Sequence, residues 1–214
     1  MESNPDSTHS SEISLRSYNV HGINQGINLL DVFCNDHTDI IFIQESWLSV
    51  NEANSKFSVY QPLYHIFNSS PMDDILSKNI LRGRPFGGLS VFILDSFYKL
   101  FNSIMCIAST DHYIIVKADK LLLVNVYLPS GKTVNCFETV GVILSEIVNI
   151  CASIAYDAIL IGGDLNCNVL KSSPLSDLIN STFNSIDAFV VSPSLIIYLL
   201  ILFPTLFLIV MPLP

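Results

Sequence analysis

Carboxylates and an amide stand at the ends of two apolar runs, where strands could present them for chemistry. Asp164 and Asn166 follow the run Ala158–Ile161 and two glycines, and Glu45 follows the run 39–44 (DIIFIQ). Residues two apart on an extended chain point to the same side, so Asp164 and Asn166 are expected to project together. Their oxygens suit a hard divalent cation and a phosphate. Taken alone, the stretch is equally typical of a strand that ends in a polar turn.

Further polar side chains lie at similar places. Asn19 comes near the end of the strand-like run Ile13–Val20, and Asn125 shares one face of the run Leu121–Leu128 with Tyr127. Functional groups of layered α/β domains collect where strand ends and loops converge. The repeated pattern therefore favours a site at one edge of a sheet, with Asn125 as a substrate-binding candidate.

One loop of the chain is basic. The segment 82–88 (RGRPFGG) carries Arg82 and Arg84, and Lys78 completes the single basic cluster. Both arginines could bind the phosphate backbone of a nucleic acid, although a solvated loop has the same composition.

The apolar periodicity predicts the elements that must position these residues. Helices are expected at Ile27–Cys34 and Phe137–Ile154, and Ser49–Ser77 is expected to be loop-like. Beyond the runs already named, strands are expected at Leu89–Leu94, Tyr98–Ala108 and Tyr113–Ala118, with Asp119-Lys120 as a hairpin turn. This order predicts one α/β sandwich with a mixed sheet rather than a strictly alternating parallel fold.

Composition limits the classes of function. The chain has 214 residues, half of them hydrophobic, and a net charge of -9, which gives no electrostatic footprint for nucleic acid. A metal-binding pocket is itself acidic, however, and its cation reverses the local sign. Five cysteines without a CxxC pair predict free thiols in a reducing compartment, hence an intracellular protein, nuclear or cytoplasmic. Residues 1–12 are polar and are expected to be disordered.

Five short motifs follow one another along the chain, and their order indicates a protein family. They are Asn19-Val20-His21-Gly22, Gln44-Glu45, Gly87-Gly88-Leu89-Ser90, Asn125-Val126-Tyr127-Leu128-Pro129 and Gly163-Asp164-Leu165-Asn166. The set resembles the endonuclease/exonuclease/phosphatase superfamily, and within it the endonuclease domain of non-LTR (LINE-type) retrotransposons. The resemblance covers residues 13–170. It implies a four-layer α/β sandwich of the DNase I-like type and nicking of DNA.

The resemblance also implies roles for single residues. Glu45 would hold Mg²⁺ or Mn²⁺, with Asn19 in the metal and phosphate shell. Tyr127 would orient the scissile phosphate, Asp164 would act on the attacking water, and Asn166 would bind phosphate or help to fix the metal. A metal ion and a carboxylate together can neutralise charge and orient the nucleophile of a phosphodiester.

The chain departs from the family's pattern near its end. Segment 185–192 looks like the family's penultimate strand, whose aspartate, here Asp187, would orient a catalytic histidine. The interval before it is short, which predicts an internal deletion near residues 168–186. No histidine lies beyond residue 112, so the final Ser-Asp-His motif is missing. Ser109-Thr110-Asp111-His112 imitates it, but its place in the chain predicts an exposed turn. We therefore expect little or no turnover.

Another departure lies in the first motif, where His21 stands in place of a carboxylate or other polar residue of many relatives. The imidazole makes a second metal ligand there doubtful.

The domain is expected to span residues 13–194, followed by the uncharged stretch Leu195–Pro214. That stretch is just long enough to cross a bilayer, but Pro204 interrupts it and no basic flank accompanies it. It is a membrane anchor, a buried strand with a tail, or the product of a misjoined gene model. The short interval before Asp187 favours the third interpretation.

Three functions remain open from the sequence. The first is a metal-dependent DNA endonuclease that is C-terminally incomplete. The second is a membrane-associated phosphatase of the same superfamily that acts on inositol phosphates or phospholipids. The third is a non-catalytic relic or binding module.

Overall fold

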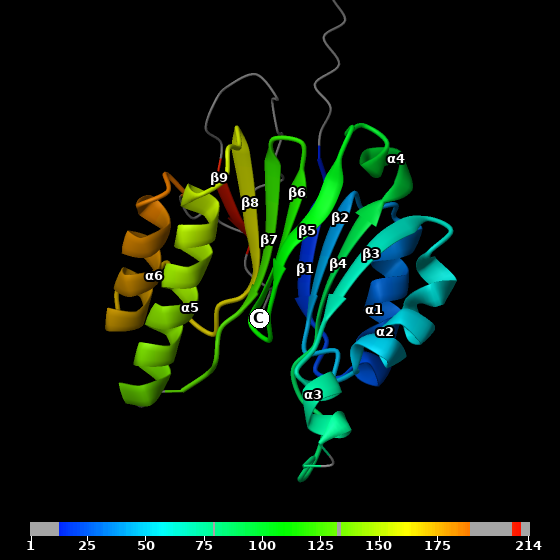
Figure 1. The fold of residues 1–214 in the computed structure, drawn as a ribbon, viewed down its shortest axis with the longest axis horizontal. Coiled ribbons are helices and arrows are strands. Elements are labelled where there is room, and N and C mark those ends of the chain that lie inside the picture. Colours follow the sequence, from blue (N-terminus) through cyan, green and yellow to red (C-terminus); the bar gives the residue numbers. More distant parts are fainter. Residues whose placement is uncertain (1–12, 79, 132–133, 189–206, 211–214) are drawn as a thin grey trace, which may run out of the picture.

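Two β-sheets face each other in the computed structural model, and helices cover the outer face of each (Figure 1). The structure describes residues 13–78, 80–131, 134–188 and 207–210. The covering helices are α1 (Ile23–Asn35) and α2 (Val50–Lys56) on one side, and α5 (Val134–Ala152) and α6 (Pro174–Asn184) on the other. The expected four-layer α/β sandwich is therefore confirmed.

The first sheet has the strand order β1-β2-β4-β3. Its strands are β1 (Leu15–Asn19), β2 (Ile40–Gln44), β3 (Tyr64–Ser69) and β4 (Leu89–Leu94). Strand β1 pairs with β2 in parallel, whereas β4 runs antiparallel to both β2 and β3. The carboxyl ends of β1, β2 and β3 consequently lie at one edge of the sheet.

The second sheet has the strand order β5-β6-β7-β8-β9. Its strands are β5 (Ile104–Ser109), β6 (Tyr113–Ala118), β7 (Leu121–Tyr127), β8 (Ala158–Asp164) and β9 (Phe207–Val210). Strand β8 runs parallel to both β7 and β9, so β7 and β8 also end at a common edge.

Alternation along β7 decides which residues face the other sheet. Leu121 and Leu123 belong to the core that both sheets share, whereas Leu122 and Val124 pack under α5 and α6. Side chains two apart on a strand share a face. Asn125 therefore points between the two sheets, like Leu121 and Leu123.

Asn125 joins the two sheets through buried hydrogen bonds. Its Nδ2 donates to the carbonyl oxygens of Ile43 and Ser90, each at 3.0 Å, and its Oδ1 accepts from Nε2 of Gln44 at 2.7 Å. Asn125 and Gln44 have 0% exposure. The hydrogen-bonding atoms of Asn125 are thus used inside the protein, and the expectation that Asn125 binds substrate stays a prediction.

The segment Ser49–Ser77 is not a loop, contrary to expectation. It contains α2, a 3₁₀ turn at Phe57–Tyr60, β3 and α3 (Met72–Ser77). The start of α2 carries a sequence signal, since Ser49 and Glu52 form a capping box in which each side chain bonds the other's backbone N–H. The polar composition of the segment hid these short elements.

Two other expected strands differ from the structure. The run Tyr98–Ala108 begins with the end of α4 (Asp95–Tyr98), and its strand starts only at Ile104. In the expected penultimate strand, residues 185–188 instead form a turn and chain segment after α6, and residues 189–192 lie outside the described residues.

Four residues of the apolar stretch after residue 194 belong to the domain. Phe207–Val210 is strand β9, which pairs in parallel with β8, and the three interpretations of that stretch stay predictions. Residues 1–12, 195–206 and 211–214 lie outside the described part, so the disorder and anchor expectations there stay predictions. The internal deletion near residues 168–186 also stays a prediction. Helix α5 is long and apolar enough to span a membrane by composition, but one side of it is buried against β7 and β8.

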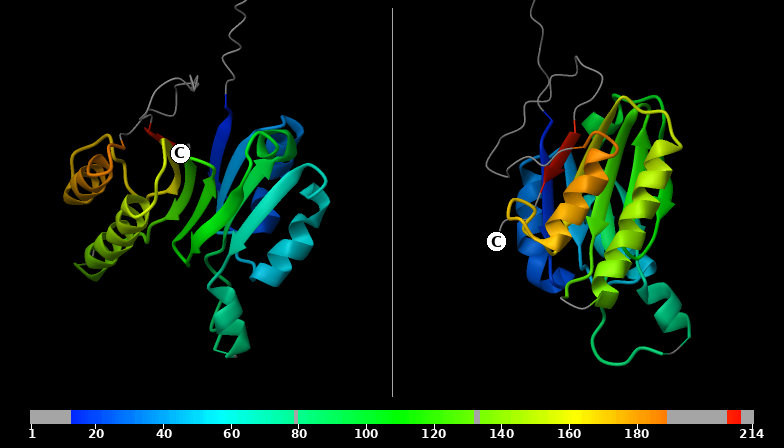
Figure 2. Two further views of the ribbon diagram at one scale, coloured as in Figure 1. Left: turned by 45° about the horizontal axis from the view of Figure 1, so that its top comes forward. Right: turned by 90° about the vertical axis from the view of Figure 1, so that its left-hand side faces the viewer.

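The described residues of the connection from β3 to β4, 70–78 and 80–88, project beyond the edge where β1, β2 and β3 end (Figure 2). They contain α3 and the predicted basic loop with Arg82 and Arg84. We call this segment the arm. It leaves and re-enters the first sheet beside the expected site.

We predict that Asn125→Ala lowers the free energy of unfolding by about 2 kcal/mol, because two buried carbonyls and the Gln44 amide each lose a partner. Chemical denaturation monitored by circular dichroism measures this change. The matched control is Asn149→Ala on the exposed side of α5, which removes no described hydrogen bond and should change stability by less than about 0.7 kcal/mol. Equal stability of the two variants would contradict the role of Asn125.

Candidate active site

Four of the predicted site residues meet at the common edge of the two sheets. Asn19 is the last residue of β1 and Glu45 follows β2 directly, while Tyr127 and Asp164 are the last residues of β7 and β8. Tyr127 and Asp164 are neighbours in the strand register. The edge therefore collects side chains from both sheets.

Asn19 links the two carboxylates. Its Nδ2 donates to Oε1 of Glu45 at 3.0 Å and to Oδ2 of Asp164 at 2.8 Å. Its Oδ1 accepts the backbone N–H of His21 at 3.0 Å, so the oxygen of this amide is already in use. Asn19 thus orients the carboxylates across the gap between the sheets, and its nitrogen rather than its oxygen faces them.

Glu45 is held by several donors. The Tyr127 hydroxyl donates to Oε1 at 2.6 Å, while Nε1 of Trp47 donates to Oε2 at 3.3 Å and Nδ1 of His21 lies 3.4 Å from the same oxygen. Burial disfavours the charged carboxylate, but the donors from Tyr127, Asn19 and Trp47, with His21 nearby, outweigh it. The pKa of Glu45 is therefore lowered.

Tyr127 shows the converse effect. Burial, followed by its hydrogen bond to Glu45 and the negative charges of Glu45 and Asp164, raises the pKa of Tyr127 above its usual range. The hydroxyl therefore keeps its proton near neutral pH and acts as a donor. It can orient the carboxylate or a phosphate oxygen but cannot serve as a base.

The backbone at this edge is unusual. Seven non-glycine residues in the described part have positive φ, and His21, Glu45, Trp47 and Asn166 are four of them. Such conformations cost energy and persist where surrounding contacts enforce them, often at functional sites. Here the N–H of Gly22 donates to the Glu45 carbonyl at 2.7 Å, and the N–H of Trp47 donates to the Gly87 carbonyl at 2.8 Å.

Asn166 lies beside these residues but is turned differently. Its backbone N–H donates to Oδ1 of Asp164 at 2.9 Å, and its Nδ2 donates to the Leu128 carbonyl at 2.8 Å. The side chain lines a separate cavity with the start of α6. Asn166 therefore fixes the second oxygen of Asp164, and a role in binding phosphate stays a prediction.

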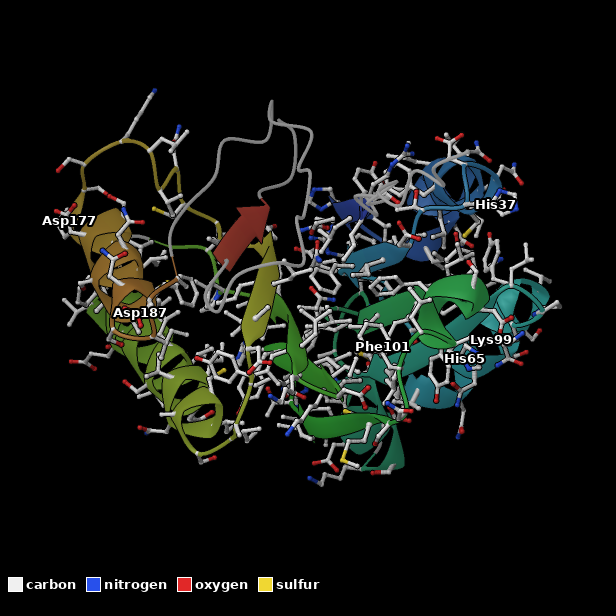
Figure 3. All side chains as sticks on the ribbon, turned by 90° about the horizontal axis from the view of Figure 1, so that it is seen from above. His37, His65, Lys99, Phe101, Asp177 and Asp187 are labelled. Carbon is white, nitrogen blue, oxygen red and sulfur yellow. The ribbon has the colours of Figure 1, made fainter. Side chains whose placement is uncertain are left out.

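Asp187 is not part of this constellation. It is exposed in the turn after α6, in the helix layer outside the second sheet (Figure 3). Burial, followed by nearby negative charge that includes Asp187, raises the pKa of Tyr156. Tyr156 precedes β8 and so lies at the opposite edge from Asp164. The structure thus places Asp187 after α6 and away from these residues, and its expected role in orienting a catalytic histidine stays a prediction.

The two arginines of the arm differ in position. Arg84 lies over the Trp47 ring, with its guanidinium carbon 4.8 Å from the ring centroid. It lines a cavity of about 350 Å³ together with Glu45 and Tyr127. Arg82 is exposed and does not line this cavity.

Asp111 and His112 also line the cavity, although an exposed turn remote from the site was expected. Nδ1 of His112 lies 3.3 Å from the Tyr127 carbonyl oxygen. A usable signal was present in the sequence. The hairpin turn expected at Asp119-Lys120 sets the register of β6 and β7, and that register leads back from this turn to His112 opposite Tyr127.

The oxygens at this edge fit a hard cation. No group of three or more His, Cys, Asp or Glu side chains placed to hold a metal occurs in the described part of the chain. Mg²⁺ typically takes one or two carboxylates and completes its shell with water and substrate phosphate. The carboxylates of Glu45 and Asp164, linked through Asn19, are a donor set of that kind.

Neither protein-family models nor curated protein sequences match the chain. Solved structures do resemble it. An AP endonuclease from Archaeoglobus fulgidus has a TM-score of 0.56 at 13% identity, over 81% of this chain and 70% of its own. The 3′ phosphatase NExo from Neisseria, bound to a product DNA hairpin, has a TM-score of 0.51 at 12% identity, over 72% of this chain. The chain covers 57% of NExo. At these identities the likeness shows the fold, which is the DNase I-like fold of these nucleases.

We predict that Tyr127→Phe raises the pKa of Glu45, because burial remains while the strongest donor is lost. A carbon-detected NMR titration of the Glu45 carboxyl group measures this shift. Tyr156→Phe, at the opposite edge, is the control and should leave it unchanged. An unaltered Glu45 pKa in Tyr127→Phe would contradict the hydrogen bond.

The same shift predicts a pH dependence of stability. The pKa of Glu45 in the folded protein lies below its ordinary value of 4.5. Its contribution to stability is therefore present above that value and is lost as the pH falls through the folded-state pKa. Tyr127→Phe should lose less stability than the native protein when the pH is lowered from about 6 to about 3. Denaturant unfolding at both pH values tests this, and a larger loss in the variant would contradict it.

Proposed function

We propose that this edge is the site of a metal-dependent phosphodiester hydrolase acting on DNA, with Mg²⁺ or Mn²⁺ as its cofactor. The observation that carries the proposal is the bridge from Asn19 to both Glu45 and Asp164, which sets two carboxylates from different sheets side by side. The DNase I-like fold supports it, and so do the neighbours, described as an AP endonuclease and as a phosphatase bound to DNA.

Each of these residues has a separate role in the proposed hydrolysis. Glu45 holds the cation, which supplies charge neutralisation at the phosphate when bound. Tyr127, protonated at neutral pH, orients the carboxylate and a phosphate oxygen. Asp164 accepts the proton of the water that attacks phosphorus, the bond from phosphorus to the leaving sugar oxygen breaks, and that oxygen takes a proton from solvent water. Arg84 lies where it can contact the backbone of the strand, and Arg82 precedes it by two residues on the arm.

We also propose that turnover of this chain is low. The leaving oxygen needs a proton, and a positioned acid contributes about 10²–10⁴-fold to such reactions. The sequence has no histidine after residue 112. Each of the two imidazoles at this edge has a described contact through Nδ1, His21 with Glu45 and His112 with the Tyr127 carbonyl. The order of the five motifs supports a relation to LINE-type retrotransposon endonucleases.

We predict that the native protein binds Mn²⁺ and that Glu45→Gln abolishes most of this binding, because the variant removes the carboxylate charge. Isothermal titration calorimetry measures the affinity. Glu138→Gln on the exposed side of α5 is the matched control and should bind like the native protein. Equal Mn²⁺ affinity in all three proteins would contradict the metal site.

We predict slow, Mg²⁺-dependent nicking of supercoiled plasmid by the native protein, and none by Glu45→Gln or Asp164→Asn. Gel electrophoresis at enzyme excess measures the conversion to open circles. Nicking that persists in both variants would contradict the assigned site. Rapid multiple turnover by the native protein would contradict low activity while leaving the site in place.

A further inference from the structure

The cavity between the arm and the site has walls of two kinds. Glu45 and Tyr127 form the wall on the side of the sheets, and Trp47, Arg84 and Phe86 form the other. Its volume of about 350 Å³ falls in the range of small-ligand pockets. In the second wall, only Arg84 has a role in the proposed hydrolysis, so Trp47 and Phe86 are unexplained. We call this space the arm cavity.

Trp47 and Arg84 form a layered pair in the second wall. The indole is fixed from behind by Gly22, where an added Cβ would lie 2.4 Å from the ring. The guanidinium covers the ring at 4.8 Å from its centroid. Arg84 is itself exposed, so the planar group is open to a further partner. Arginine in this arrangement stacks on aromatic rings.

Phe86 adds an aromatic side chain to the same wall. It is 50% exposed. A singly exposed phenylalanine needs no explanation. Phe86, however, lines one cavity together with Trp47 and Arg84, so three planar groups gather within it. Such groups bind flat aromatic rings by stacking, and each base–aromatic stack contributes substantially to binding of single strands.

Polar groups in the cavity can accept the N–H donors of a base. The carboxylates of Glu45 and Asp111 line the space together with the guanidinium of Arg84 and the imidazole of His112. Carboxylates accept N–H donors, and adenine, cytosine and guanine each carry an amino group. A base bound in the arm cavity would lie next to Glu45. The proposed function places the phosphate of the same strand at Glu45.

We propose that the arm cavity binds one unpaired nucleobase of single-stranded DNA, stacked on Arg84 and Phe86. The inference rests on the proposed function for the position of the adjoining phosphate. A base within a duplex is covered on both faces by its neighbours and on its edge by its partner, so it cannot enter. The cavity therefore prefers an unpaired nucleotide of a strand to a base within continuous duplex.

Trp47 gives a direct test, because it is the single tryptophan of the chain. A ten-nucleotide single strand of mixed sequence is titrated in EDTA, so that metal-dependent turnover does not interfere. We expect saturable quenching of Trp47 fluorescence. A blunt hairpin duplex, and a single strand built from abasic tetrahydrofuran units, should bind at least about tenfold more weakly.

Variants separate stacking from charge. Arg84→Gln and Phe86→Ala should each weaken single-strand binding by about tenfold. Their matched controls are Arg16→Gln at the opposite edge and Phe137→Ala on α5, which should bind like the native protein. Unchanged circular dichroism spectra confirm that each variant is folded.

Asp164→Asn distinguishes the two proposals. It should lose nicking, as predicted above, but retain quenching by the single strand, because Asp164 does not line the arm cavity. If nicking fails and base-dependent quenching is seen, the cavity assignment holds without the hydrolase assignment. Binding of the abasic strand or the duplex as tightly as the normal single strand, or unchanged binding by Phe86→Ala, would overturn the arm cavity proposal.

Discussion

The buried contact between Gln44 and Asn125 fixes how the two sheets meet. A fully buried amide pair is favourable only when its partners are in place, so it penalises any shift of one sheet against the other. Each member directly precedes the site along its own strand. Glu45 follows Gln44, and Tyr127 comes two residues after Asn125 on the same face. The 2.6 Å contact between Tyr127 and Glu45 therefore depends on the register that the buried pair sets.

The backbone next to the site is strained, and contacts from neighbouring segments hold it in that conformation. Glu45 and Trp47 both have positive φ, and the turn between them is held by Gly22 at the start of α1 and by Gly87 at the end of the arm. That arrangement turns the Glu45 carboxylate towards the second sheet and the Trp47 ring towards the arm. One short segment thus serves both the phosphate site and the arm cavity.

Much of the fold followed from periodicity, because apolar runs such as the one in β2 are buried wherever they occur. The resemblance and the strand-end pattern together predicted Asn19, Glu45, Tyr127 and Asp164 at one edge, and the structure brings them together. Distances across the sheets were not predictable. The amide of Asn125 looked like a ligand but is buried, and α6 carries Asp187 to the opposite edge. His112 was missed because its neighbour is 15 residues away along a hairpin, not along a strand.

The proposed hydrolysis depends on a divalent cation bound at Glu45, between the two sheets. Crystals of the protein grown or soaked with Mn²⁺ test this binding most directly, through the anomalous scattering of the metal. We expect an anomalous peak within coordination distance of the Glu45 carboxylate, lost in crystals of Glu45→Gln. A peak elsewhere on the protein, or none at saturating Mn²⁺, would contradict it.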